Sequence, residues 1–185
     1  MNWLDDFAIL SEWALRSLDL RYKFIFAESP AQVMSGEGIS RALETAATLA
    51  IYEAHLAKGY VPESTIDFER SYPNSKPKQN PKRCDLAFKS AGVGTKWAFM
   101  ELKYYGQFGK AQVAKDIVKL KGITIKASRW MLIYRVREKI GTTPLQSLLD
   151  THFSKSLVIK RSTSFDTHVW PKEDALCEIC ICQVC

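Results

Sequence analysis

The sequence predicts an α/β fold in which one mixed β-sheet is flanked by helices. Three observations lead to this prediction: helical periodicity near the start of the chain, three successive strand-like runs in its middle, and a further helix followed by an apolar strand. The 185 residues suit one domain, and an apolar share of 46% is enough to form a core. We therefore expect a single domain over residues 1–185, with a core over about 36–137 and an extension over 138–185.

Two helices are expected before the first strand. Apolar residues recur at helical spacing from Trp3 to Leu18, which predicts an N-terminal helix over 1–21. A second helix is predicted from about Glu37 to Lys58, because the small and apolar residues there are periodic and Gly59 ends the run.

A sheet is predicted from runs of β-branched, aromatic and apolar residues. The first three runs are Tyr60–Phe68, Cys84–Phe88 and Trp97–Tyr105. A helix from about Phe108 to Lys121 follows, and a buried strand is expected at Trp130–Val136. The predicted order is therefore α-α-β-β-β-α-β.

The extension is expected to add one helix and two strands. Thr143 and Pro144 are predicted as the N-cap and the first residue of a helix that reaches Phe153. The β-prone segments after it are Ser156–Lys160 and Ala175–Val184.

The net charge of +6 conceals a strongly basic middle third. Residues 76–137 carry fifteen Lys and Arg against three Asp and Glu, a net of +12, whereas residues 1–75 have a net of −5 and residues 138–185 a net of −1. Such a basic window is expected on a surface that meets phosphate groups. Its three acids are Asp85, Glu101 and Asp116. Isolated carboxylates among so many cations point to a bound divalent cation.

The start of the chain indicates a cytoplasmic protein. Its first twenty residues include four acids and no basic segment of the kind that opens a signal peptide. No apolar stretch approaches the roughly 20 residues needed to span a bilayer, so no membrane association is expected. Five cysteines without an export signal fit reduced thiols or a metal site better than disulfides.

Glu101, Leu102 and Lys103 form the only acid-x-Lys triplet of the chain. In a strand, alternate residues share a face, so Glu101 and Lys103 are expected to point the same way. Asp85 begins the preceding strand and can converge on the same place. Two carboxylates and the carbonyl of Leu102 form an oxygen-only set that suits Mg²⁺, for which Mn²⁺ can substitute. Lys103 is then expected to orient a water or to stabilise charge on a phosphodiester.

With these residues, the chain resembles the PD-(D/E)XK nuclease superfamily over roughly residues 36–137. The resemblance implies a restriction-endonuclease-like αβββαβ core, with Asp85 and Glu101 as metal ligands and Lys103 as the catalytic lysine. Cys84 stands where the name of the motif has proline, and that proline is often missing in this superfamily.

The resemblance also implies residues that support the site. Glu44 looks like the glutamate that many members place on the first core helix, and Glu37 is the weaker alternative. Gln112, Asp116 and Lys119 are spaced i, i+4 and i+7 on the later helix, which many members use to set polar residues beside the site.

A DNA nuclease is the function that these residues and the resemblance imply, with an endonuclease in restriction, phage defence or repair favoured. DNA is expected rather than RNA, and a homodimer or an activating partner subunit would supply specificity. The expected nucleic-acid contacts are Lys76, Lys78, Lys82, Arg83 and Lys119. Four of them lie in or beside a proline-stiffened loop that leads into Asp85.

Two other functions are compatible with the sequence. The first is a catalytically inactive copy of the nuclease fold that binds nucleic acid or assists assembly. The second is a zinc-dependent interaction module at the tail, where four thiols are Cys177, Cys180, Cys182 and Cys185. The apolar residues between these cysteines favour a buried strand over a zinc site.

Overall fold

The computed structural model describes residues 3–26, 36–57, 64–71, 83–90, 97–167 and 175–185. In chain order its elements are α1 (Trp3–Phe26), α2 (Gly36–Ala57), β1 (Ser64–Ser71), β2 (Arg83–Ser90), β3 (Trp97–Tyr104), α3 (Gly109–Lys121), β4 (Ala127–Glu138), α4 (Leu145–Phe153), β5 (Leu157–Asp166) and β6 (Ala175–Val184).

The strands form one mixed, open sheet in the order β1-β2-β3-β4-β6-β5. β1, β2 and β3 make an antiparallel meander, and α3 connects β3 to the parallel strand β4. The predicted α/β class and the predicted order of elements are therefore confirmed. Of the first predicted strand, Tyr60–Phe68, the part from Ser64 onward is confirmed, and β1 continues to Ser71; the predicted residues before Ser64 lie outside the described residues.

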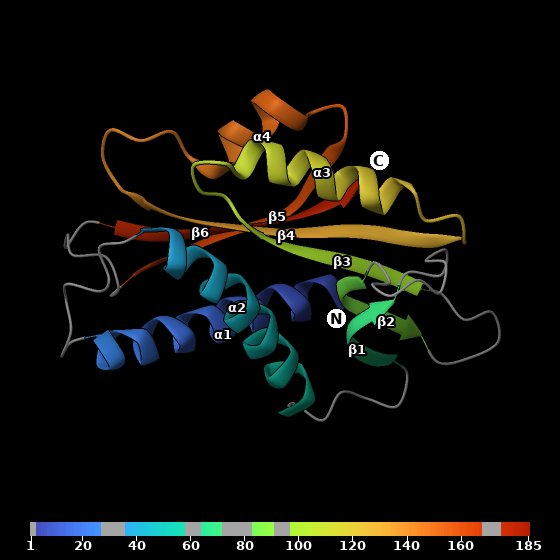
Figure 1. Ribbon diagram of the computed structural model, residues 1–185, viewed down its shortest axis with the longest axis horizontal. Coiled ribbons are helices and arrows are strands. Elements are labelled where there is room, and N and C mark those ends of the chain that lie inside the picture. The colour runs from blue at the N-terminus through green and yellow to red at the C-terminus, as the bar shows by residue number, and fades with distance from the viewer. Residues whose placement is uncertain (1–2, 27–35, 58–63, 72–82, 91–96, 168–174) are drawn as a thin grey trace.

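Helices cover both faces of the sheet. α1 and α2 pack on one face, and α3 and α4 pack on the other (Figure 1). Alternation along the strands supplies a separate core to each layer. Leu102 and Leu132 pack with Phe7 and Ile51 on the α1–α2 side. On the α3–α4 side, the core includes Phe99, Val113 and Ile133. The sheet is thus buried on both faces.

The C-terminal extension completes the sheet. β6 pairs antiparallel with β4 on one side and with β5 on the other, which confirms the predicted strand at Ala175–Val184. Alternation places Cys177 in the α1–α2 core and places Cys180 and Cys182 in the α3–α4 core. Thiols on opposite faces of a sheet do not converge on one tetrahedral ion. The described geometry therefore does not support the four-cysteine zinc site.

The start of α4 differs from its prediction. Pro144, and not Thr143, is the N-cap residue, and neither side chain caps the helix. Instead, the backbone N–H of Leu145 donates to Oε2 of Glu178 at 2.8 Å. Glu178 lies 33 residues further along the chain, so this cap depends on tertiary contact. The residues around the start of α4 therefore do not indicate this cap.

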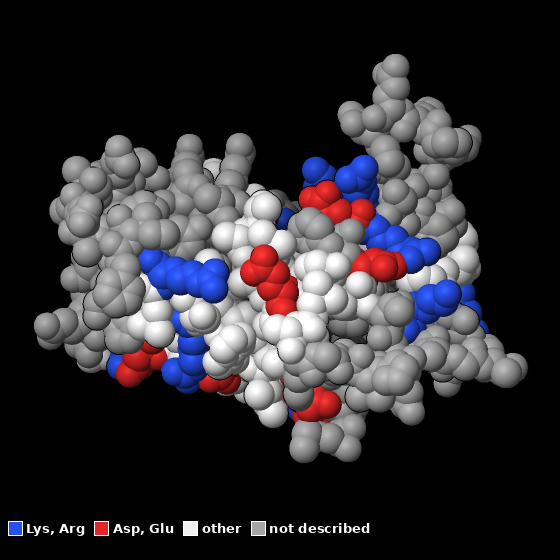
Figure 2. Space-filling view, turned by 90° about the horizontal axis from the view of Figure 1, so that it is seen from below, with Lys and Arg blue, Asp and Glu red and all other residues white. Residues whose placement is uncertain are grey.

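In the view of Figure 2, many of the described residues are uncharged, an acidic side chain lies near the middle of this surface, and charges of both signs lie around it. Exposed apolar side chains on α1 and α2 include Ile9, Trp13, Leu49 and Leu56. In the described ranges, none of the helices is both long enough and apolar enough to cross a bilayer.

Candidate active site

The candidate site lies where β2 and β3 separate. Their ladder runs from the pair Lys89–Trp97 to the pair Leu86–Met100 and ends there. The β1–β2 ladder is also interrupted next to this point, opposite Glu69, whose φ of 48° lies in the left-handed region. Asp85 is therefore outside both ladders, and its side chain is not tied to the regular pleat of the sheet.

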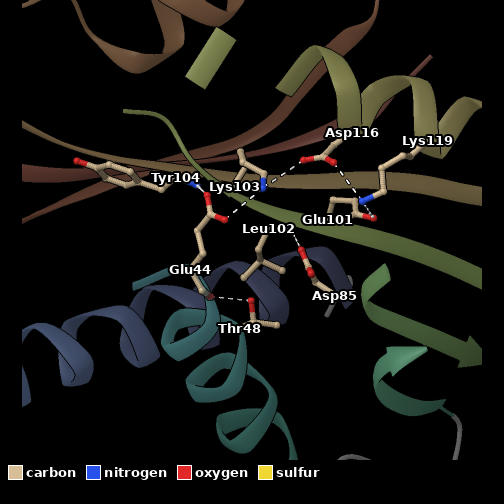
Figure 3. A network of polar contacts seen from close by, with 9 residues as sticks. All are labelled: Glu44, Thr48, Asp85, Glu101, Leu102, Lys103, Tyr104, Asp116 and Lys119. Atoms are coloured by element: carbon tan, nitrogen blue, oxygen red, sulfur yellow. Dashed lines mark hydrogen bonds and ion pairs between the residues drawn. The ribbon is translucent and has the colours of Figure 1, made fainter. Parts of the chain in front are cut away.

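Two carboxylates take the place of the missing strand partner. The backbone N–H of Leu102 donates to Oδ2 of Asp85 at 2.6 Å, and the N–H of Tyr104 donates to Oε1 of Glu44 at 3.0 Å. Both N–H groups belong to alternate residues of β3, so both point to the side that β2 has left. The gap is thus lined by Asp85 from β2 and by Glu44 from α2 (Figure 3).

Glu101 and Lys103 lie on the other side of β3 from Leu102, which is buried among the residues beneath α1 and α2. Strand alternation turns them towards α3. α3 starts close to the end of β3 because Gly109 lies against the ring of Tyr105, where an added Cβ would be 2.9 Å from Cγ. This short connection brings the side chains of α3 above the site.

Ion pairs join five of these side chains: Glu44, Lys103, Asp116, Lys119 and Glu101 (Figure 3). Asp85 is linked to them through the backbone N–H of Leu102 and through its electrostatic interactions with both lysines. Together the six residues form the charged network. Nζ of Lys103 is 3.2 Å from Oε2 of Glu44 and 3.4 Å from Oδ2 of Asp116. Nζ of Lys119 is 3.1 Å from Oε1 of Glu101 and 3.1 Å from Oδ1 of Asp116. Asp116 therefore bridges the two lysines.

The network draws on both faces of the sheet. Glu44 comes from α2 on one face, whereas Asp116 and Lys119 come from α3 on the other. They meet at Lys103 because the separation of β2 from β3 opens the sheet there. A continuous sheet would keep the two helices apart.

Four carboxylates and two ammonium groups give the network a charge of −2 when all are ionised. Glu101 and Asp116 are buried, at 2% and 5% exposure. Burial is the largest influence on the Asp85 carboxyl and raises its pKa, while the N–H of Leu102 and the two lysines oppose this shift. With all six groups ionised, the carboxylates of the network outnumber its ammonium groups by two, and an excess of negative charge favours the binding of a cation.

Both lysines of the network are held in the charged state. Burial alone would lower the pKa of Lys103, but Asp116 and Glu44 outweigh it and raise the pKa. Burial also acts to lower the pKa of Lys119, which Glu101 and Asp116 raise instead. Each ammonium group is thus a fixed positive charge over the ordinary pH range.

The thiol of Cys84 lies close enough to the charged network to be affected by its negative charge. The thiol donates to the backbone oxygen of Arg70 at 3.3 Å. Burial, followed by the negative charges of Glu101 and Asp85, raises the pKa of the Cys84 thiol to about 12. Cys84 is therefore a neutral packing residue beside the site, and not a nucleophile.

The structure brings together the predicted residues Glu44, Asp85, Glu101, Lys103 and Asp116, and it places Lys119 beside them, on the helix expected to set polar residues beside the site. Lys119 was predicted to contact nucleic acid, but its ammonium group lies inside the charged network. Gln112 is exposed near the start of α3 and is not part of the network.

Other predicted residues are placed outside the network or lie beyond the described side chains. Arg83 is exposed and pairs with Glu69 at 3.1 Å. The remaining residues of the predicted phosphate-contacting loop lie outside the described residues: Lys76, Lys78 and Lys82. The side chain of Glu37 is likewise outside the described part of the chain.

The donor atoms at the gap fit a hard divalent cation. Asp85 and Glu101 contribute carboxylate oxygens from two strands. The N–H and C=O of a strand residue point to the same side, so the carbonyl of Leu102 is directed to the gap. Magnesium commonly takes one or two carboxylates and keeps several waters. In the described ranges, groups of three or more Asp, Glu, His or Cys side chains placed to hold a metal are absent.

Two features of the site were not recognised in the sequence. The bridging role of Asp116 was missed, although this residue is one of three acids in the basic window, which was the signal for it. The use of the Tyr104 N–H as a donor to Glu44 has no sequence signal, because it depends on where β2 leaves β3.

Comparison with known proteins adds no relative to this description. No family model, curated protein or solved structure gives a significant match to the chain.

Proposed function

We propose that the chain is a metal-dependent nuclease that hydrolyses phosphodiester bonds of DNA, with its active centre at the gap between β2 and β3. One observation carries the proposal: Asp85, Glu101, Lys103 and Glu44 meet at a single break in the sheet, with a net negative charge. These residues come from three separate elements: β2, β3 and α2.

The proposal gives each residue a role. Asp85 and Glu101, with the carbonyl of Leu102, would hold Mg²⁺ or Mn²⁺. When bound, such a cation supplies positive charge to the phosphodiester and acidifies a water. Lys103 is a permanently charged donor that would stabilise the negative charge developing on the phosphate. Glu44 holds Lys103 in place through the 3.2 Å contact.

DNA is the proposed substrate because the resemblance is to DNA nucleases. In addition, Asp85, Glu101 and Lys103 lie within the basic window of residues 76–137. Isolated cations attract any polyanion, so charge alone does not distinguish DNA from RNA. A role in restriction, phage defence or repair follows from the resemblance only, and a second copy or a partner subunit would provide recognition.

A cleavage assay tests the proposal. Purified protein is incubated with plasmid, linear and single-stranded DNA in Mg²⁺, in Mn²⁺ and in EDTA. We expect cleavage with either metal and none with EDTA. Glu101→Gln and Asp85→Asn should each lower the rate about 100-fold or more, because each removes a charged ligand worth several kcal/mol of transition-state stabilisation. Lys103→Ala should lower the rate and leave metal binding in place.

The matched control is Glu53→Gln, which removes a carboxylate from the exposed surface of α2 and should cleave like the wild type. Equal rates for wild type and Glu101→Gln on every substrate would exclude catalysis at this site. DNA binding that persists without any cleavage would instead support an inactive nuclease fold.

A further inference from the structure

Lys119 occupies an unexpected position for a lysine on a basic helix. Its ammonium group is 3.1 Å from Oε1 of Glu101, a carboxylate that is only 2% exposed. A buried carboxylate is costly unless a positive charge lies beside it. Lys119 supplies that charge in the described structure.

Lys103 does not supply it. The ammonium group of Lys103 lies towards Glu44 and Asp116, at 3.2 Å and 3.4 Å. The two lysines therefore divide the carboxylates between them, with Asp116 shared, and Glu101 is paired with Lys119 (Figure 3). Glu101, which is proposed as a metal ligand, is thus already paired with the ammonium group of Lys119.

The position of Lys119 allows it to leave Glu101 without a change in the backbone. Its side chain is 24% exposed, so it lies at the border of the network and the solvent. Its second partner, Asp116, is one turn away on the same helix, at 3.1 Å. A flexible four-carbon stem can keep the contact with Asp116 while its ammonium group moves away from Glu101.

We propose that Lys119 is the resident counter-ion of Glu101 and that it competes with the divalent cation for this carboxylate. The inference rests on the proposed function, since it assumes that Glu101 is a metal ligand. It assigns to Lys119 a role that differs from simple phosphate contact: the lysine neutralises Glu101 until a cation replaces it. Binding of the cation then releases a positive side chain at the edge of the site.

Metal affinity tests the competition directly. Mn²⁺ binding to chelator-treated protein is measured by titration calorimetry for the wild type and Lys119→Met. Removing a unit charge about 3 Å from a ligand oxygen should tighten Mn²⁺ binding about tenfold or more. Lys119→Arg keeps the charge and should bind Mn²⁺ like the wild type. Lys115→Met removes an exposed lysine of the same helix and should also leave the affinity unchanged.

A labelling experiment on the wild type makes the test independent of any folding defect in Lys119→Met. Trace acetylation of lysines is followed by mass spectrometry, with Mn²⁺ or with EDTA. The acetylation of Lys119 should rise severalfold with Mn²⁺, whereas that of Lys115 should not change. In Glu101→Gln, labelling of Lys119 should be high under both conditions.

The outcomes separate this inference from the proposed function. If Glu101→Gln abolishes Mn²⁺ binding but Lys119→Met leaves it unchanged or weaker, the competition is wrong and the metal site stands. Labelling of Lys119 that does not respond to Mn²⁺ would also overturn the competition. If neither wild type nor Lys119→Met binds Mn²⁺, both the inference and the proposed metal-dependent function are wrong.

Discussion

Two groups of buried and half-buried charges lie on the same sheet, and they differ in the balance of positive and negative charge. At the gap between β2 and β3, four carboxylates face two ammonium groups. At the junction of β4, β6 and α4, one guanidinium faces one carboxylate: Nε of Arg137 is 2.9 Å from Oε2 of Glu178, and Nη2 is 3.0 Å from Oε1. Both groups are polar clusters in an apolar sheet.

The Arg137–Glu178 pair also makes hydrogen bonds to the backbone around it. Oε2 of Glu178 accepts the N–H of Leu145, and Nη1 of Arg137 donates to the backbone oxygen of Glu138 at 2.8 Å. The pair therefore ties two strands to the start of α4 and leaves no net charge. The pair is therefore a structural contact.

The network at the gap has the opposite character. Its carboxylates exceed its cations by two, and burial raises the pKa of Asp85 because the charged form is disfavoured there. Excess buried charge of one sign opposes folding, and proteins keep it mainly where a ligand or a reaction requires it. Charge balance, more than burial, therefore distinguishes the proposed site from the structural pair. Three predictions test it.

The largest expected effect on stability is at the balanced pair. Glu178→Ala leaves the guanidinium of Arg137 without its carboxylate and removes the cap of α4. We expect the free energy of unfolding in urea to fall by about 3–5 kcal/mol. Asp166→Ala removes an exposed partner of Lys139 and should change it by about 1 kcal/mol or less. Adding Arg137→Met to Glu178→Ala should recover part of the loss, and no recovery would contradict the charge argument.

A smaller effect of opposite sign is expected at the gap. Asp85→Asn keeps an oxygen for the N–H of Leu102 and removes the charge. The folded-state pKa of Asp85 is raised above the ordinary value of 3.8. The protonated Asp85 carboxyl therefore favours the folded state fully at a pH below 3.8, and this stabilisation is lost as the pH rises through the folded-state pKa. Urea unfolding in EDTA should therefore show Asp85→Asn to be more stable than the wild type at pH 7. The difference should vanish in acid, and a less stable variant at pH 7 would break the comparison.

The smallest effect concerns the five cysteines, four of which lie on β6 or directly after it and one, Cys84, beside the gap. Burial raises the pKa of the Cys180 thiol to about 11 and that of the Cys182 thiol further, whereas Cys185 is exposed. With a chromogenic disulfide reagent, we expect one thiol to react quickly in the native protein. The four buried thiols should react only after unfolding. Stoichiometric zinc in the purified protein, released as the thiols react, would instead support the four-cysteine site.

Some of the site could be predicted because it depends on local patterns. Strand alternation places Glu101 and Lys103 on one side of β3, and the neighbouring strand of a meander brings Asp85 opposite them. The role of Lys119 could not be predicted in the same way. Helix spacing shows the direction in which a side chain points, but it does not show which group lies across from it, so net charge alone suggested a phosphate contact.

The order of helices and strands and the α/β class could be predicted from the amino-acid sequence, and so could the candidate residues Asp85, Glu101 and Lys103, because periodicity, turns and alternation are properties of neighbouring residues. Three features are visible only in the folded chain: β6 lies between β4 and β5, Glu178 caps α4, and β2 leaves β3 beside Asp85. These features depend on pairing between distant segments, whose register is set by packing on both faces of the sheet. The same long-range packing brings Glu44 and Lys119 to one gap from opposite sides.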